Sequence, residues 1–325
     1  MESQELSCQP RMTCMPRSFD VNAPENFITT PSITKNALDN VYNHFLNRDS
    51  DIYITTYPKS GTTWTISIIE HLINKVPQKG ISIGYSTQEC CVWLDRVASR
   101  EEWRLIFSEL EEMKSTRFFK SHACVGLIKH PARIIQCIRH PLDTFVSEWH
   151  HIRGKQKVYD YNGSWNHFFS EIVMTGKNEG GDWFDYHEEF LQASKEGKID
   201  ALFLKYEDMK KDNAISAIHQ IAQFIGVEYY DAEKVSLATS FTKMKEKSSQ
   251  GHINRDGNLS DDYVSQELGD KNTPSNAHIR KGIVGDWVNY LSDDELTMWR
   301  NYVNTKKDSC PHVVDLFSLD NLLCN

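Results

Sequence analysis

Residues 51–64 of the chain read Asp-Ile-Tyr-Ile-Thr-Thr-Tyr-Pro-Lys-Ser-Gly-Thr-Thr-Trp. The first seven are rich in β-branched and aromatic side chains, which predicts a strand that ends at Pro58. A loop, residues 59–62, follows, and isoleucines then recur at helical spacing from Ile66 to Ile73. This order of strand, glycine-containing loop and helix predicts an α/β fold.

Three further segments are expected to be strands that lead into helices, at residues 116–119, 133–138 and 199–204. Strands that alternate with helices predict a parallel sheet with helices on both faces. Ligands of such sheets bind beyond the carboxyl ends of the strands. The polar candidates at those ends are Lys59, His122, Arg139 and Tyr206.

The composition is that of an ordinary globular protein, with 39% hydrophobic and 25% charged residues among 325. That length allows one large α/β domain or two small ones. No stretch approaches the ~18 apolar residues of a membrane span. The net charge of −9 argues against general binding to nucleic acid or to an anionic membrane, because the long-range field repels both. An anionic ligand therefore needs a local concentration of basic groups.

The first twenty residues contain only scattered apolar side chains and no hydrophobic signal core, which predicts a flexible tail at residues 1–20. Residues 21–325 are expected to form one domain. The eight cysteines are dispersed and form no Cys-x-x-Cys pair, so no zinc site is expected. These features predict a reduced, cytoplasmic protein.

Residues 243–278 are polar, with few apolar positions. A polar stretch of this length inside a domain is usually either disordered or a functional lid. The basic sequence Arg280-Lys281-Gly282 that follows it favours the lid.

The loop at residues 59–62 has the composition of an anion site. Backbone N–H groups and the dipole of the following helix favour phosphate or sulfate there. Lys59 adds a full charge, and Ser60, Thr62 and Thr63 add hydroxyl donors. The loop is not the nucleoside-triphosphate loop, because its lysine precedes the glycine. An ordinary strand-to-helix turn is the alternative.

No magnesium ligand accompanies this loop. The strand at residues 133–138 leads into Arg139, where many triphosphate enzymes place a metal-binding aspartate. A kinase or nucleotide hydrolase would need both that metal ligand and a triphosphate loop. An anion site that works without a metal is therefore expected.

Residues 55–64 resemble the 5′-phosphosulfate loop of the cytosolic sulfotransferases, whose donor is 3′-phosphoadenosine 5′-phosphosulfate. Residues 280–287 repeat the family's pattern Arg-Lys-Gly-x-x-Gly-Asp-Trp. The similarity runs from about residue 27 to residue 299, with the motifs in the family's order. It implies a single α/β domain of the P-loop-like sulfotransferase fold, with about five parallel strands. It also implies a small-molecule acceptor, the product adenosine 3′,5′-bisphosphate and no metal.

The resemblance assigns catalytic roles to three residues. Lys59 corresponds to the lysine that binds the oxygen between phosphate and sulfate, where charge grows as the S–O bond breaks. Lys120-Ser121-His122 matches the family's Lys-Thr-His, with His122 as the general base. An unperturbed histidine pKa near ~6.5 suits that role. Lys120 would help to neutralise the sulfuryl oxygens. Without this match, a single histidine would be assigned to the core or to the surface. A catalytically inert nucleotide-binding module is a further alternative, and it would be expected to lack Lys59, Lys120 or His122.

The resemblance also implies a donor site. Its residues are Lys59, Ser60, Gly61, Thr62, Thr63, Trp64, Arg139, Ser147, Tyr206, Thr239, Phe241, Arg280, Lys281 and Gly282. Arg139 and Ser147, with residues 280–282, match the binders of the 3′-phosphate, for which the planar arginine fork is suited. Trp64 and Phe241 match the two faces on which the adenine stacks. Core packing is the alternative role for Phe241.

By the same resemblance, the acceptor pocket surrounds His122 and is walled by Trp93, Trp149 and His151. His151 stands where phenol-specific members carry an aromatic wall residue. Together with the neighbouring Glu148, it indicates a hydroxyl- or amine-bearing acceptor of polar or cationic character. The alternative is that Glu148 faces solvent on its helix.

Many animal members of the family dimerise through the pattern Lys-x-x-x-Thr-Val-x-x-x-Glu after the Gly-Asp-Trp. The matching positions here are Val288, Ser292, Asp293 and Thr297. A monomer and a homodimer both remain possible.

Overall fold

The computed structural model describes residues 29–31, 33–73, 91–155, 159–249 and 279–324. They form one α/β domain around a five-stranded parallel sheet in the order β2-β3-β1-β4-β5. The strands are β1 (Ile52–Thr55), β2 (Cys91–Trp93), β3 (Phe118–Ser121), β4 (Arg133–Ile138) and β5 (Asp200–Lys205). The predicted fold class is confirmed.

Alternate side chains of the strands face two separate cores. In β1, Tyr53 packs into one apolar cluster, while Ile52 and Ile54 pack into the other. The same alternation separates Phe119 from Phe118 in β3. Because both faces are buried, helices must cover the sheet on both sides.

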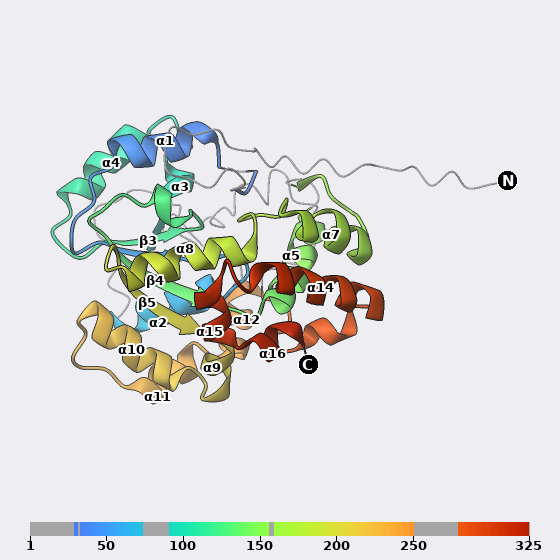
Figure 1. Ribbon diagram of the computed structural model, residues 1–325. Coiled ribbons are helices and arrows are strands. Elements are labelled where there is room, and N and C mark those ends of the chain that lie inside the picture. The colour runs from blue at the N-terminus through green and yellow to red at the C-terminus, as the bar shows by residue number, and fades with distance from the viewer. Residues whose placement is uncertain (1–28, 32, 74–90, 156–158, 250–278, 325) are drawn as a thin grey trace.

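The helices divide between these two faces (Figure 1). The larger core is covered by α1 (Lys35–His44), α3 (Leu94–Val97), α4 (Trp103–Glu112), α5 (Pro141–Gly154), α7 (Trp165–Glu171), α8 (Trp183–Lys195), α14 (Asp293–Lys306), α15 (Pro311–Phe317) and α16 (Leu319–Leu323). The smaller core is covered by α2 (Thr62–Leu72), α9 (Tyr206–Lys211), α10 (Ile215–Ile225) and α11 (Ala232–Ala238), with α12 (Phe241–Ser249) beside them. Short 3₁₀ turns are η1 (Val125–Leu127), η2 (Val173–Thr175) and η4 (Asp286–Asn289).

Four of the strands lie where the sequence predicts them, to within two residues. The fifth, β2, has only three residues, too few to show an alternating pattern. The predicted tail at residues 1–20 lies outside the described residues. Most of the predicted lid, residues 243–278, also lies outside them, but residues 243–249 belong to α12. In the described ranges, no helix has both the length and the apolar character that a membrane crossing requires.

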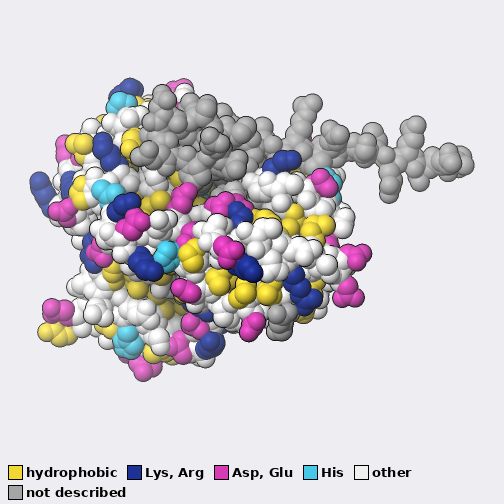
Figure 2. All heavy atoms as spheres, in the orientation of Figure 1, with side chains coloured by type: hydrophobic (Ala, Val, Ile, Leu, Met, Phe, Trp, Pro, Cys, Tyr) yellow, Lys and Arg dark blue, Asp and Glu magenta, His cyan; other side chains and the backbone are white. Residues whose placement is uncertain are grey.

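The parallel register aligns the ends of neighbouring strands. Thr55 of β1 pairs with Ser121 of β3, and Trp93 of β2 pairs with Lys120 of β3. The residues that follow the strands therefore meet at one edge of the sheet. Elsewhere, on the face that Figure 2 shows, basic and acidic side chains are interspersed.

A buried ion pair anchors the amino end of the central strand. Arg117 donates to the Asp51 carboxylate from Nε at 2.7 Å and from Nη2 at 2.5 Å, and both side chains have no exposed surface. Arg117 also donates to the carbonyl oxygens of Leu110 and Leu46, at 3.1 and 2.8 Å. Every charged group of this pair is thus satisfied inside the fold.

Asp51→Asn should lower the free energy of unfolding by about 3–5 kcal/mol, because it leaves the buried Arg117 charge without its counter-ion. Asp200→Asn is the control, since the Asp200–Arg133 pair is 62% and 30% exposed and should contribute less than about 1 kcal/mol. Urea unfolding followed by circular dichroism measures both. Equal losses in the two variants would contradict the assigned role.

Candidate active site

The loop between β1 and α2 is shaped to receive an anion. Lys59 and Gly61 have positive φ values of 67° and 115°, and a Cβ on Gly61 would lie 2.9 Å from the Cys137 sulfur. Gly61 is the N-cap of α2 and supplies no side-chain hydrogen bond to the first amides of the helix. The hydroxyl of Ser60 is buried and has no partner within the described structure. A helix N-terminus beside a buried hydroxyl fits a phosphate or sulfate group.

Other loop hydroxyls are already engaged. The hydroxyl groups of Thr56 and Thr62 form a hydrogen bond with each other across the loop. Thr63, the next residue, is half-buried in the first turn of α2.

The side chain of Lys59 lies among other cations. Burial, and then the positive charge of Lys155, lowers the pKa of Lys59 to about 7, against the opposing effect of Glu179. Lys120 and Arg139 act in the same direction as Lys155. Lys59 is therefore a lysine whose charge an incoming anion would stabilise.

His122 follows β3 directly and is held in one tautomer. Its Nδ1 lies 2.8 Å from the carbonyl oxygen of Thr56, which can only accept, so Nδ1 carries the hydrogen. The lone pair of the neutral ring is then on Nε2. Burial, and then the charges of Lys120 and Lys59, lower the pKa of His122 to about 3. In this state the histidine is a neutral base.

Lys120 and Trp93 complete the group around His122. The Lys120 ammonium lies 3.6 Å from the centroid of the Trp93 ring, a cation–π contact. The same ring meets His122 edge to face, at 5.8 Å between centroids. The pairing of β2 with β3 thus places the Trp93 ring against both Lys120 and His122.

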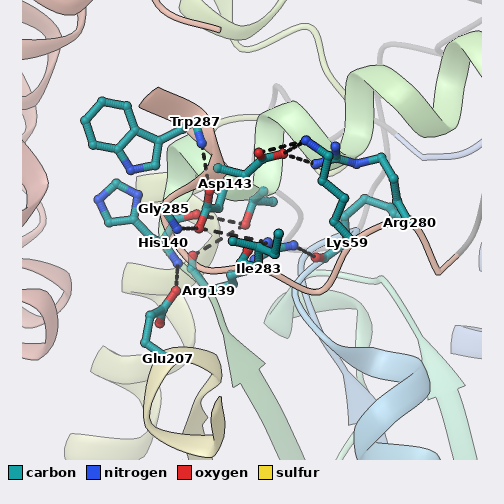
Figure 3. A network of polar contacts seen from close by, with 12 residues as sticks. Lys59, Arg139, His140, Asp143, Glu207, Arg280, Ile283, Gly285 and Trp287 are labelled. Atoms are coloured by element: carbon teal, nitrogen blue, oxygen red, sulfur yellow. Dashed lines mark hydrogen bonds and ion pairs between the residues drawn. The ribbon is translucent and has the colours of Figure 1, made fainter. Parts of the chain in front are cut away.

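Arg139, at the end of β4, joins the loop after β1 to a segment far along the chain, as Figure 3 shows. Its Nη1 donates to the carbonyl oxygen of Lys59 at 3.4 Å, and its Nη2 to that of Ile283 at 3.1 Å. The guanidinium lies over the ring of Tyr206, 4.6 Å from the centroid. Its Nε is buried and, within the described structure, has no partner.

Asp143 holds residues 283–287 beside Arg139 (Figure 3). The two oxygens of its buried carboxylate accept the backbone N–H groups of Gly285 and Trp287, at 2.6 and 3.1 Å. Ser147 is half-buried and lies one turn beyond Asp143 on the same face of α5. Asp143 was not among the residues singled out from the sequence.

Asp286 orients the two cations of the late motif. It accepts from Arg280 Nη2 at 2.6 Å and from Lys281 Nζ at 2.9 Å. Although burial raises its pKa, hydrogen bonds from Lys281, Arg280 and Asn289 bring the pKa of Asp286 to about 2. The Nε of Arg280 is left without a partner in the described residues.

Two aromatic rings flank a third lysine. Lys210 Nζ lies 5.7 Å from the centroid of Trp64 and 6.0 Å from that of Phe241. A Cβ on Gly282, at a φ of 63°, would overlap the Phe241 ring, so only glycine allows the late motif to lie against it. Trp64 also meets Tyr206 edge to face at 5.6 Å. The sequence pattern does not single out Lys210, because it is one of two adjacent lysines in the last turn of α9.

Thr239 is at the C-terminal end of α11, and its hydroxyl donates to the carbonyl oxygen of Val235 at 2.9 Å. Its side chain is fully buried and serves the preceding helix. The Thr239 hydroxyl is therefore already hydrogen-bonded to the last turn of α11.

The three expected pocket residues have different surroundings. Trp93 contacts His122, and His151 Nδ1 lies 3.4 Å from Lys59 Nζ. Trp149 instead packs edge to face on Trp165 and Tyr290, at 5.9 and 6.0 Å. The structure therefore brings Trp93 to His122 and His151 to Lys59, whereas the described contacts of Trp149 are made elsewhere.

Glu148 does not face solvent, so that alternative is wrong. Its side chain is 1% exposed, and its Oε1 accepts the backbone N–H of Glu179 at 2.9 Å. Burial, and then the nearby charge of Glu179, raises the pKa of Glu148 well above its usual range. Asn178 Nδ2 donates to the other oxygen at 3.3 Å.

Comparison with known proteins agrees with this geometry. Residues 49–309 match the family model described as the sulfotransferase domain. Rabbit (Oryctolagus cuniculus) amine sulfotransferase is 31% identical over 255 residues, which cover 76% of this chain and 77% of the relative. Human sulfotransferase 2A1 is 29% identical over 274 residues, 81% of this chain and 86% of the relative.

A mouse sulfotransferase, crystallised in complex with PAP, superposes with a TM-score of 0.66. It is 24% identical, and the superposition covers 88% of this chain and 95% of that one. At this identity the superposition supports the fold. Because the family model spans most of the chain and the rabbit relative exceeds 30% identity, the chain belongs to the sulfotransferase domain family and is a sulfotransferase dependent on 3′-phosphoadenosine 5′-phosphosulfate.

Proposed function

We propose that this sulfotransferase transfers the sulfuryl group to a hydroxyl or amine of a small polar or cationic molecule by in-line displacement. His122 is the general base, and Lys59 and Lys120 stabilise the charge that develops. The observation that carries this proposal is the pairing of His122 Nδ1 with the Thr56 carbonyl oxygen, which directs a free lone pair at Nε2. Lys120 lies over the same Trp93 ring that His122 meets edge to face, which supports its place beside the base.

In the proposed reaction, His122 accepts a proton and the two lysines stabilise negative charge. His122 Nε2 takes the acceptor's proton while the acceptor atom forms a bond to sulfur. The bond between sulfur and the bridging oxygen breaks, and its electron pair stays on the 5′-phosphate. Lys59 stabilises that growing charge more than it stabilises the ground state, which lowers the barrier. Lys120 neutralises the sulfuryl oxygens.

The remaining donor residues hold the nucleotide. We place the 3′-phosphate between Arg139 and Ser147 on one side and residues 280–282 on the other. This is supported by Arg139 and Arg280, whose Nε groups are buried and have no partner in the described structure. Trp64 and Phe241 are proposed to stack on the adenine, with Tyr206 beside the nucleoside and Thr239 behind Phe241.

The acceptor class is supported by the polar groups beside Lys59 and by one relative. His151 and the buried Glu148 replace the apolar wall that a flat phenol requires. The rabbit relative is named an amine sulfotransferase. We place the reaction in the cytoplasm, without a metal, and leave monomer and homodimer as alternatives.

Adenosine 3′,5′-bisphosphate should bind at least ~10-fold more tightly than adenosine 5′-monophosphate, because charge-assisted hydrogen bonds to a 3′-phosphate contribute more than 1.4 kcal/mol together. Calorimetry measures both affinities. Arg280→Met should weaken the bisphosphate and leave the monophosphate unchanged. Comparable affinities in the wild-type protein would contradict the assigned 3′-phosphate site.

His122→Ala should lower kcat by ~100-fold or more and leave the affinity for adenosine 3′,5′-bisphosphate nearly intact, since general-base loss affects the chemical step. Turnover of radiolabelled donor, with and without excess chelator, is the measurement. His219→Ala, on the exposed side of α10, is the control and should keep full activity. Near-normal turnover by the His122 variant, or loss of activity with chelator, would overturn the mechanism.

Binding of adenosine 3′,5′-bisphosphate at pH 8 should take up close to one proton. Lys59, with a pKa of about 7, is mostly neutral at that pH in the free protein, and the bound 5′-phosphate favours its charged form. The affinity should therefore fall as the pH rises above 7. Calorimetry in buffers of different ionisation enthalpy measures the uptake. Undiminished uptake in Lys59→Met would show that another group takes the proton.

A further inference from the structure

Glu179 is a buried carboxylate beside the catalytic lysines, and sulfuryl transfer has no step for it. Its side chain is 6% exposed, and its charge acts on Lys59. A negative charge opposes an anionic donor, so its presence in this place needs a reason.

The backbone around Glu179 is fixed against the donor loop itself. The N–H of Glu179 donates to Glu148 Oε1 at 2.9 Å, and the hydroxyl of Tyr57 donates to the carbonyl oxygen of Gly181 at 2.7 Å. Gly180, at a φ of 92°, lies so close that a Cβ there would be 2.8 Å from the Tyr57 ring and 3.1 Å from Pro58. The turn that carries the carboxylate is therefore tied to the loop that carries Lys59.

The side chain of Glu179 is only half satisfied. Its Oε2 accepts from the Tyr159 hydroxyl at 3.0 Å, while Oε1 forms no hydrogen bond within the described part of the chain. Tyr159 in turn meets His151 edge to face at 6.0 Å, and His151 contacts Lys59. One carboxylate oxygen thus remains for a ligand, and the other is linked through Tyr159 to His151 and Lys59.

The surrounding charges determine which ligand suits that oxygen. Burial raises the pKa of Glu179, and the positive charges of Lys59, Lys120 and Lys155 oppose this rise. Once the anionic donor neutralises Lys59 and Lys120, these cations support the carboxylate less. A cation brought by the acceptor would then replace them and stabilise the charged form.

We infer that Glu179 binds the protonated amine of an acceptor that also carries a hydroxyl, and that the enzyme sulfates the hydroxyl. The inference rests on the proposed sulfuryl transfer. A carboxylate keeps the amine protonated, and a protonated nitrogen has no lone pair with which to attack sulfur. The hydroxyl gives its proton to His122 Nε2 and forms the O–S bond as the S–O bond to the phosphate breaks. The amine leaves unchanged, on an O-sulfated zwitterion.

Two matched pairs of acceptors test this inference. Tyramine and 4-propylphenol differ only in an ammonium group against a methyl group, as do 3-amino-1-propanol and 1-butanol. The wild-type enzyme should prefer the amine of at least one pair by ~10-fold or more in kcat/KM. Mass spectrometry of the product should find the sulfate on oxygen. No preference in either pair, or a sulfate on nitrogen, would overturn the inference.

Glu179→Gln keeps the size of the side chain and a carbonyl oxygen for Tyr159 but removes the charge. It should abolish the preference by lowering kcat/KM for the amine ~10-fold, without weakening nucleotide binding or slowing turnover of the neutral partner. Glu179→Asp should keep part of the preference. Glu189→Gln is the control and should retain it, because Glu189, half-buried on α8, has no part in the proposed donor or acceptor site. Equal losses on both members of a pair would indicate a merely structural role and refute the inference.

Binding is a second readout if the probes are turned over slowly. Tyramine should bind the complex of the wild-type protein with adenosine 3′,5′-bisphosphate at least ~10-fold more tightly than the Glu179→Gln complex, by calorimetry. Equal binding would overturn the inference. Turnover of the neutral probes that depends on His122, without any preference for amines, would sink the role of Glu179 alone. Absence of nucleotide binding or of dependence on His122 would instead count against the proposed function.

Discussion

The concentration of positive charge at the carboxyl edge of the sheet is the constraint on which this structure depends. Lys59, Lys120 and Arg139 follow or end three neighbouring strands, so the parallel register forces them together inside a protein whose net charge is −9. Burial and mutual repulsion lower the pKa of Lys59 to about 7. This concentration of charge is unfavourable by itself, and an anionic nucleotide would relieve it.

Acidic residues make that concentration tolerable and also shape the site. Asp143 lies 3.9 Å from Arg139, but its two oxygens are aimed at backbone N–H groups of the late motif. Asp286 pairs with both Arg280 and Lys281. Neither carboxylate saturates the neighbouring arginine, since the Nε groups of Arg139 and Arg280 have no partner in the described residues. The same arrangement is what a phosphate needs from its binding site.

Burial affects the pKa of His122 in the same way as that of Lys59. His122 and Lys59 are both half-buried, and their partial burial lowers the pKa of each. A bound anion favours the charged form of each, so donor binding should prepare the lysine and strengthen the base in one event. Glu179 acts on Lys59 in the opposite direction, and its negative charge would favour a cationic acceptor.

The sequence alone determined the features that are local or follow the regular geometry of a sheet. The strand-loop-helix order around Gly61 and the positions of His122 and Arg139 directly after strands need only contiguous residues and the alternation rule. The resemblance added the late motif. Tertiary structure alone decided the three-residue β2, the clamp by Asp143, and the burial of Glu148 against Glu179. These depend on partners that are distant in sequence, and no pattern along one helix or strand shows which polar side chain a distant segment will cover.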